Sequence, residues 1–413
     1  MAATAANDHE EASAIPPQTT ATRNGVHVAP FAGWRINNSQ LNALAARYAT
    51  PWDPSGAAPP AETALTLHAW QQSNTLIQDP QPALYAYEQS GPRGAVRGVL
   101  GAVHLDSKLL PHQDLIPERV AHICDLVHET GFNLDPLMLS YPGTGRAATW
   151  LDHCRSSRPV TEVLGDDGQL HRLWRLAERE AVHDIGAELA GRSAFIADGH
   201  HRHVAARQLR RDYYATGSGP GGWDFVPALL VDARDTPVRI GPVHRVLPYT
   251  DPDQALSAAA QRFHVQPIPG ELRQWVQRLR EQTRTGPAFV AITRGGAYLL
   301  SNPDRGFVNA CLGNCPAPLH GLPLSVLRHV LIDAVWRVPD LPEYVSPETS
   351  AATALARVRR AGGMAILVPP PEHRHLRTAM SAGLRLPAKS TSFLPKPHPG
   401  LLYRSLAEVP APR

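Results

Sequence analysis

The sequence of 413 residues is roughly two to three times as long as a single-core domain, which predicts two packed lobes and excludes a small disulfide-stapled module. Apolar residues (43%) and charged residues (19%) are as frequent as in globular chains with a sizeable core. The formal charge is only +3 and the basic residues are scattered, so we expect no nucleic-acid partner. No apolar run approaches the ~18 residues of a membrane helix, so we expect no membrane partner either.

The first 28 residues are rich in Ala, Thr, Pro and acidic side chains, which predicts a disordered tail over 1–28. They lack the basic and apolar pattern of a signal peptide, and their acidic residues argue against a transit peptide, so the expected location is cytoplasmic. Four cysteines give no disulfide framework, and Cys311 and Cys315 lack the second pair that a structural zinc ion requires.

From residue 29 onward, strand patterns and helix patterns alternate. Apolar stretches over 84–87 and 96–105 predict neighbouring strands around a Gly-Pro-Arg-Gly turn. Pro117 begins an amphipathic helix that ends at Gly131, because proline suits the first turn of a helix and glycine suits its end. A second helix is expected over 178–189, and it stops near a glycine.

A strand over 193–198 then leads through a tight turn into another helix, and a buried strand follows over 223–231. A further strand over 238–247 is interrupted by Gly241-Pro242. The pattern restarts after about residue 250, with further helices and strands that end in a Pro-rich segment over 387–399. This restart predicts an α/β (mixed α+β) protein with one lobe over 29–250 and a second α/β lobe over 251–413.

The sharpest functional signal lies in the turn Asp198-Gly199-His200-His201-Arg202. Glycine allows the tight turn, and the next residues present free amides at a helix N-terminus, where the helix dipole favours an anion. Arg202 adds a planar fork that can hold two phosphate oxygens, and the imidazoles can donate hydrogen bonds or move a proton. The alternative is that Asp198 caps the helix and the histidines are surface residues.

Metal ions are a second possibility at this turn. Direct ligation by His200, His201 and His203 is disfavoured, because adjacent histidines diverge at a helix start and no other ligand cluster is evident. A magnesium ion carried mainly by phosphate oxygens needs only one or two carboxylates, and Asp198 is the candidate for that contact.

Polar groups also follow a predicted strand near residue 110. His112, Asp114 and Glu118 have acid/base capacity and stand just before or at the start of the predicted helix, a position typical of site loops. Capping alone would also explain Asp114. Farther along, His244 and Arg245 are adjacent on a strand, so their side chains point to opposite faces and at most one of them is expected to enter a site.

The Pro-rich segment contains two of the three lysines among the 40 basic residues, Lys389 and Lys396. Lysine is a compact charge suited to phosphate, and the hydroxyls of Ser390 and Thr391 can bind phosphate or metal. The segment lacks the glycines of a P-loop, so a surface loop is the competing interpretation.

Taken together, these residues resemble a large bacterial family known as domain of unknown function 1015. The shared pattern runs in the same order over about residues 29 to 405: Pro30–Arg35, Leu84–Gln89, Leu110–His112, Asn133–Pro136, His171–Trp174, Ile196–Arg202, His244–Arg245, Lys389–Thr391 and Pro395–Lys396. It places Lys389 and Lys396 in a recurring segment, which favours a functional or lobe-docking role for both.

The Gly-His-His-Arg turn is similar to the phosphate-binding turn of the ParB/sulfiredoxin superfamily, which includes free-serine kinases. This resemblance implies a ParB/sulfiredoxin-like nucleotide-binding lobe over 29–250 in which Gly199, His200, His201 and Arg202 contact nucleotide phosphates. Sulfiredoxin chemistry is excluded because it needs a cysteine where a histidine stands here. ParB-type DNA partitioning would need an attached DNA-reading module, which the sequence does not show.

The resulting hypothesis is a small-molecule kinase that binds ATP or ADP with Mg²⁺ and phosphorylates a hydroxyl, such as that of serine or a related amino acid. Positioning and charge neutralisation dominate such transfers. The catalytic candidates are His112, Asp114, Glu118, Asp198 and His201; the further phosphate-binding candidates are His244, Arg245, Lys389, Ser390, Thr391 and Lys396.

One departure from the family matters for this hypothesis. The family often has Glu directly after the histidine that aligns with His112, whereas this chain has Gln113, which cannot usefully accept a proton. Asp114 or Glu118 would have to substitute. The rival hypotheses are therefore a nucleotide-binding regulatory protein without transfer activity and an NTP hydrolase or phosphatase. The sequence leaves open the acceptor, the nucleotide and whether the protein is a homodimer.

Overall fold

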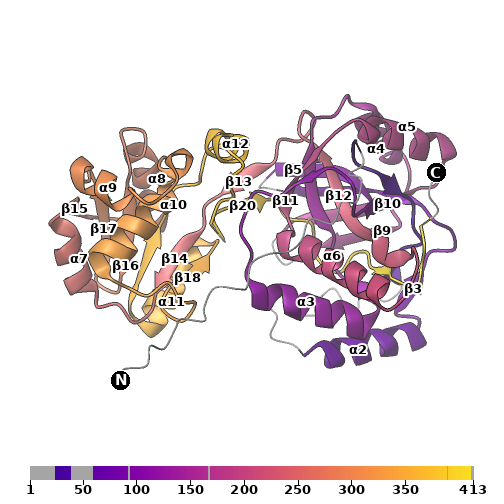
Figure 1. The fold of residues 1–413 in the computed structure, drawn as a ribbon, viewed down its shortest axis with the longest axis horizontal. Coiled ribbons are helices and arrows are strands. Elements are labelled where there is room, and N and C mark those ends of the chain that lie inside the picture. Colours follow the sequence, from indigo (N-terminus) through magenta and orange to yellow (C-terminus); the bar gives the residue numbers. More distant parts are fainter. Residues whose placement is uncertain (1–23, 39–58, 92–93, 166–167, 388, 411–413) are drawn as a thin grey trace, which may run out of the picture.

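A computed structural model describes residues 24–38, 59–91, 94–165, 168–387 and 389–410. Two lobes lie side by side, and each is built on its own β-sheet (Figure 1). Helices accompany both sheets, which confirms the predicted mixed α/β class. None of the helices in these ranges is long and apolar enough to cross a membrane.

The sheet of the first lobe has nine strands within the described ranges, ordered β6-β11-β8-β12-β5-β4-β10-β9, with β1 beside β5. The pairs β6–β11 and β8–β12 are parallel and the other pairs are antiparallel. The bounds are Val28–Ala29 (β1), Leu84–Gly91 (β4), Gly94–His104 (β5), Leu109–Leu110 (β6), Leu137–Tyr141 (β8), Thr161–Leu164 (β9), Leu170–Leu176 (β10), Ala194–Asp198 (β11) and Phe225–Asp232 (β12).

Helices cover this sheet because its strands alternate apolar side chains between two faces. One face packs against α4 (Arg146–Cys154) and α5 (Arg179–Ala190). The other face packs against side chains from α2 (Pro60–Gln72), α3 (Pro117–Thr130) and the C-terminal segment. Helix α3 also packs along α6 (His200–Ala215), and it ends at Gly131 with φ 69°, as its sequence predicts.

The second lobe holds a six-stranded sheet, ordered β15-β17-β16-β19-β14-β18 within the described part of the chain. Its strands are His244–Leu247 (β14), His264–Ile268 (β15), Phe289–Thr293 (β16), Gly296–Ser301 (β17), Ser346–Glu348 (β18) and Met364–Leu367 (β19). Its helices are Pro252–Ala260 (α7), Leu272–Gln282 (α8), Arg305–Cys311 (α9), Pro323–Val326 (α10), the π-helix Leu327–Trp336 (η4), Ala351–Ala361 (α11) and His373–Ser381 (α12). Helices α7 and η4 cover one face of the sheet, and α8 and α11 cover the other.

The stretch over 238–247 is interrupted at Gly241-Pro242, as its sequence predicts, and its two halves are strands in different sheets. β13 (Arg239–Gly241) pairs with β20 (Ser392–Leu394), whereas β14 joins the sheet of the second lobe. Proline at position 242 explains the break, since it cannot donate a ladder hydrogen bond. The chain therefore crosses between lobes near residue 242, while the boundary expected at residue 250 stays a prediction.

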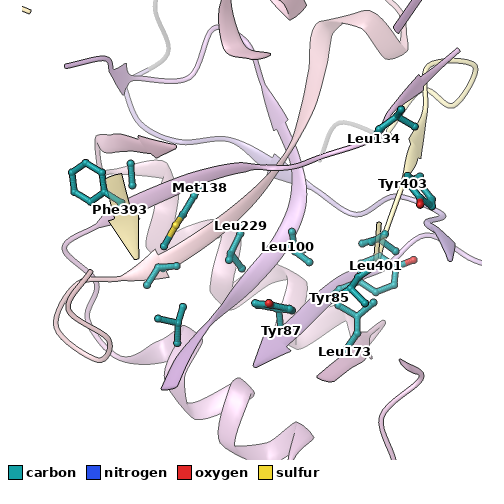
Figure 2. Packing of buried hydrophobic residues seen from close by; sticks show 14 of the residues in the cluster. Tyr85, Tyr87, Leu100, Leu134, Met138, Leu173, Leu229, Phe393, Leu401 and Tyr403 are labelled. Carbon is teal, nitrogen blue, oxygen red and sulfur yellow. The ribbon is translucent and has the colours of Figure 1, made fainter. Parts of the chain in front are cut away.

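The C-terminal segment returns to the first lobe. After β20, strand β21 (Arg404–Ser405) pairs with β7 (Phe132–Asn133). Figure 2 shows Phe393, Leu401 and Tyr403 from this segment over the sheet face that also carries Tyr85 and Leu229. The apolar side chains of the last 20 or so residues thus contribute to the core of the first lobe, so the C-terminal lobe expected over 251–413 includes a segment that packs elsewhere.

Two-stranded ribbons complete the first lobe. β2 (Trp34–Ile36) pairs with β3 (Leu76–Gln78). Residues 1–23 of the expected tail lie outside the described residues. Residues 24–28 were also expected in that tail, but Val26 is fully buried and its amide donates to the carbonyl of Leu189, which fixes this stretch to the end of α5.

Arg404 anchors the returning segment. Its side chain is fully buried, and its guanidinium donates to Asn133 Oδ1 and to the carbonyls of Phe225, Gly222 and Glu408 at 2.9–3.2 Å. Removal of the guanidinium would leave several buried acceptors without a donor.

We predict that Arg404→Ala lowers the free energy of unfolding by about 3 kcal/mol, because buried acceptors lose charged donors. Chemical denaturation of the full chain measures this change. Arg377→Ala, at an exposed position of α12, is the matched control and should change stability by less than about 0.5 kcal/mol. Equal effects of the two substitutions would contradict the anchoring role of Arg404.

Candidate functional site

A cavity of about 500 Å³ lies in the first lobe, between α3, α6, the 133–136 loop and the returning C-terminal segment. Its lining includes the apolar side chains of Ile123, Leu126, Leu209 and Val226. It also includes charged side chains from four separate stretches of the chain: Glu118, Arg119, Asp135, Asp198, Arg202, Lys389 and Lys396. The volume is typical of sites for small ligands.

The turn between β11 and α6 forms the polar end of this cavity. Gly199 has φ 97°, in the left-handed region, and a Cβ at this position would lie 2.8 Å from Cδ2 of Leu137. Glycine is therefore needed both for the backbone angle and for the close approach. Helix α6 begins at His200, and no side chain in the described ranges caps it, so its first amides are available to an anion.

Asp198 is held between two cations at this turn. Its Oδ1 lies 3.0 Å from Nζ of Lys396, and its Oδ2 accepts a hydrogen bond of 2.5 Å from Arg202. Burial alone would raise the pKa of Asp198, but Arg202 and Lys396 outweigh that effect and lower the pKa to about 2. The carboxylate is therefore ionised throughout the physiological range.

Arg202 bridges two parts of the site. Besides Asp198, its guanidinium lies 3.4 Å from Oδ2 of Asp135 and donates to the carbonyl of Pro136 at 2.5 Å. These contacts fix the orientation of the guanidinium. Arg202 lines the cavity together with Lys389 and Arg119, which add positive charge.

Lys389 is a half-buried member of this cation cluster. Burial, together with the charges of Arg119 and Lys396, lowers the pKa of Lys389 to about 8. Its backbone adopts a left-handed φ of 56°, and its carbonyl accepts a hydrogen bond of 3.0 Å from Arg245. Arg245 lies on β14, so a strand of the second lobe supports a residue that lines the cavity.

His201 lines the cavity and connects the two helix starts. Its Nε2 accepts a hydrogen bond of 2.9 Å from the amide of Ile116, the residue before α3. Burial and the nearby charges of Lys389 and Arg119 lower the pKa of His201 to about 4, so the ring is neutral near pH 7. A neutral ring with Nε2 as acceptor carries its proton on Nδ1.

His112 and His200 lie behind the cavity and are not among the described residues that line it. Nε2 of His200 accepts from the amide of His112 at 3.2 Å, and the His112 ring stacks on Phe195 with ring centroids 4.5 Å apart. Burial lowers the pKa of His112 to about 4 and, with the neighbouring His112, that of His200 to about 2. Both rings are neutral and buried, which suits support of the turn.

Gln113 and Thr391 complete this supporting layer. The Thr391 hydroxyl donates to Oε1 of Gln113 at 3.2 Å and therefore accepts from Nε2 of His112 at 2.8 Å. Residue 113 is the position where the resemblance in sequence led us to expect Glu, and the Gln113 side chain contacts the C-terminal segment. It does not belong to the described wall of the cavity.

The remaining sequence candidates lie in three places. Glu118 lines the cavity from the first turn of α3, whereas Asp114 is exposed and outside the described wall. Ser390 is buried and donates to the carbonyl of Pro387. His244 accepts from the amide of Val368 in the sheet of the second lobe. The structure thus gathers Glu118 with the two lysines and with Asp198, Gly199, His201 and Arg202 of the turn. It leaves the other candidates, His200 among them, outside the described wall.

Asp135 was not among the candidates from sequence. Its side chain is 15% exposed, its Oδ1 is buried, and this oxygen has no hydrogen-bond partner among the described residues. Burial outweighs the attraction of Arg202 and raises the pKa of Asp135 to about 6. The motif Asn133–Pro136 belongs to the recurring pattern, and a carboxylate followed by proline in that pattern was the available signal.

The donor set permits only limited metal binding. Within the described ranges, no three or more His, Cys, Asp or Glu side chains form a cluster that could hold a metal ion. Both oxygens of Asp198 already face cations, whereas Asp135 keeps one unpartnered oxygen. The residues therefore fit a Mg²⁺ ion that brings most of its ligands with it on phosphate oxygens and water.

Comparison with known proteins gives one sequence match and several structural ones. The model of a family described as "Protein of unknown function (DUF1015)" matches residues 49–325. No curated protein matches the sequence.

Solved structures similar to this chain include a mutant free serine kinase in complex with AMP. It is 12% identical over 71% of this chain and 87% of that chain, with a TM-score of 0.37. A conserved hypothetical protein from Pyrococcus furiosus is 13% identical over 71% of this chain and 90% of that chain, with a TM-score of 0.35. SbnI with a C-terminal truncation, from Staphylococcus aureus, is 13% identical over 71% and 82%, with a TM-score of 0.33.

We predict that Gly199→Ala destabilises the protein by at least about 1–2 kcal/mol, because alanine is strained at φ 97° and its Cβ would meet Leu137. Thermal or chemical unfolding measures the change. Gly191→Ala is the matched control, since its φ is −99° and a Cβ there meets nothing within 4 Å. A neutral Gly199→Ala variant would show that the turn is not fixed as described.

Proposed function

The chain belongs to the DUF1015 family, and we propose that it uses the cavity of its first lobe to bind ATP or ADP and to transfer a phosphoryl group to a small hydroxyl compound. The observation that carries this proposal is the set of four cations, Arg119, Arg202, Lys389 and Lys396, around the uncapped start of α6. Positive side chains and free helix amides together favour a polyanion with closely spaced charges.

Each cation has a distinct geometric task in this proposal. Arg202 presents a planar fork whose orientation is fixed by Asp198 and the carbonyl of Pro136, so it suits two oxygens of one phosphate. Lys389 and Lys396 come from the returning C-terminal segment and line the same cavity. Phosphoryl transfer needs charge neutralisation on both the transferring and the leaving group, which cations from separate segments of the chain can supply.

The apolar part of the cavity suits the nucleoside. Ile123 and Leu126 on α3 face the same cavity as Leu209 on α6 and Val226 on β12. A nucleobase buries apolar ring surface, and such a wall beside a cationic end matches the two halves of a nucleotide. The family resemblance to free-serine kinases makes serine or a related amino acid the first acceptor to test.

Magnesium would enter with the nucleotide. When bound, it would shield the phosphate charges, and Asp135 with its unpartnered oxygen is the carboxylate best placed to contact it; Asp198 would first have to exchange a cation. The protein residues themselves bind the phosphates, orient them at the helix start and exclude water through the apolar wall.

A binding protein without transfer activity is the second candidate. One observation favours it: Gln113 stands where the family often has a carboxylate, and its side chain is occupied by Thr391. Tight nucleotide binding with no product from any amino acid would support this candidate over the kinase. Release of inorganic phosphate without an acceptor would instead indicate a hydrolase or phosphatase.

We predict that Arg202→Ala lowers kcat/KM for nucleotide-dependent phosphorylation on the order of 10³-fold, because a charge on the transferring group is lost. Phosphorus NMR with ATP or ADP, Mg²⁺ and L-serine measures the product. Arg211→Ala, at an exposed position of the same helix, is the control and should leave the rate unchanged. Full activity of Arg202→Ala would exclude this turn as the phosphate site.

Nucleotide affinity should also depend on pH through Lys389. Because its pKa is lowered to about 8, Lys389 loses its proton as the pH rises through 8, and ATP binding should weaken by roughly fivefold between pH 7 and 9. Lys389→Arg keeps its charge over this range, so its affinity should vary less. Isothermal titration at several pH values measures both. Identical pH profiles for the two proteins would show that Lys389 does not contact the nucleotide.

A further inference from the structure

Asn133 lines the cavity at the place where the returning C-terminal segment pairs with the first lobe. It belongs to β7, where its backbone is opposite Arg404 of β21, and it is only 9% exposed. Its Oδ1 accepts a hydrogen bond of 3.2 Å from the guanidinium of Arg404. The backbone and the side chain of Asn133 are thus both held by the same residue, so the carboxamide has a fixed orientation.

The contact with Arg404 decides which end of the Asn133 carboxamide is left for a ligand. A guanidinium can only donate, so the oxygen faces Arg404 and the amide nitrogen Nδ2 points away from it. Nδ2 has no hydrogen-bond partner among the described residues, and unlike Oδ1 of Asp135 it is not sealed from solvent. Because Asn133 lines the cavity, this accessible donor is available to a ligand there.

Asn133 is remote from the starts of the two helices that flank the cavity. These starts meet, since the amide of Ile116 donates to Nε2 of His201. Farther along, Sγ of Cys124 lies 3.7 Å from the carbonyl of Ala205, so α3 and α6 run in the same direction. Helix α3 has 14 residues and is about 20 Å long, and Asn133 comes shortly after its last turn. The cations that these helices contribute to the cavity stand in their first turns.

The surroundings of the Asn133 amide combine apolar side chains with a positive charge behind the oxygen. Leu134 and Val226 line the same cavity, and Arg404 also donates to the carbonyl of Phe225, the residue before Val226. A cation on Oδ1 polarises the carboxamide and makes the hydrogens on Nδ2 better donors. The complementary ligand group is an acceptor atom set in an apolar ring, and the ring nitrogens of a purine have this character.

We propose that Asn133 recognises the base of the nucleotide by donating a hydrogen bond from Nδ2 to a ring nitrogen of adenine. This inference rests on the proposed function, which places the phosphates at the helix starts. The base then lies along the apolar side chains of α3 and α6, with an acceptor edge toward β7. Arg404 is a positioning residue, because it is outside the described cavity wall and sets the direction of the Nδ2 donor.

The first test uses Asn133→Asp in the full chain. Aspartate keeps the size of the side chain and an oxygen for Arg404, and it removes both N–H donors. We expect its affinity for ADP, measured by isothermal titration, to fall roughly tenfold. Its denaturation midpoint should stay at or above that of the unmodified chain, because Arg404 gains a counter-charge. Asn309→Asp, at an exposed position of α9, adds the same charge and should bind ADP like the unmodified chain.

Deaza analogues of ADP give a second measurement that needs no variant. Each analogue replaces one ring nitrogen of adenine, N1, N3 or N7, with a C–H group. One of them should bind the unmodified chain roughly tenfold more weakly than ADP does, and Asn133→Asp should bind that analogue and ADP equally. The comparison separates the hydrogen bond from the new charge of the variant, because charge repulsion would weaken the binding of both ligands alike.

Several results would overturn the role of Asn133. They are an unchanged ADP affinity of Asn133→Asp, equal binding of ADP and all the deaza analogues by the unmodified chain, and discrimination that persists in the variant. A loss of affinity for 2′-deoxy-ADP in place of a deaza analogue would move the donor to the ribose and overturn the contact with the base. No binding of ADP to the unmodified chain, with or without Mg²⁺, would instead overturn the proposed nucleotide site, and the inference with it.

Discussion

The ion pairs of Asp198 join the turn before α6 to the returning C-terminal segment. Arg202, four residues along on α6, and Lys396, from that segment, meet on its two oxygens. A partly buried carboxylate between two cations is stable in its charged form, and Asp198 and Lys396 lose this ion pair if the C-terminal segment moves away. The turn, the C-terminal segment and the cavity between them therefore depend on one another.

This arrangement explains why the C-terminal segment is anchored so heavily. Strand pairing with β13 and β7, the contact of Thr391 with His112, and the buried guanidinium of Arg404 all hold it against the first lobe. Arg245 adds a contact from the second lobe to the carbonyl of Lys389. The second lobe thus contacts the site through the backbone of Lys389, which lines the cavity. This contact gives a physical route by which the position of the second lobe affects ligand binding.

Local sequence patterns were sufficient to predict part of the fold and of the site. The strand, glycine turn and helix around residue 199 follow from an apolar run, one glycine and amphipathic spacing, and the helix from Pro117 to Thr130 follows from proline, spacing and a terminal glycine. The resemblance to the family also favoured a functional or lobe-docking role for Lys389 and Lys396, and both line the cavity in the structure.

Contacts between residues that are far apart in the chain could not be predicted from local sequence patterns. His112 and Thr391 are 279 residues apart, and no local pattern indicates that they meet. Burial decides their chemistry: His112 has the polar character of a site residue in sequence, but between aromatic rings it supports the turn. Asp135 is the converse case, since only its surroundings distinguish it from an ordinary loop carboxylate. The interruption at Gly241-Pro242 is visible in the sequence, but the fact that its two halves join different sheets is not.

We have proposed that the start of α6 and the two lysines hold nucleotide phosphates. The most direct measurement is a crystal structure of the full chain grown with ADP and Mg²⁺. We expect phosphate density at the amides of His201 and Arg202, within hydrogen-bond distance of the guanidinium of Arg202 and of Nζ of Lys389 or Lys396. Nucleotide bound elsewhere, or an empty cavity at saturating nucleotide, would contradict it.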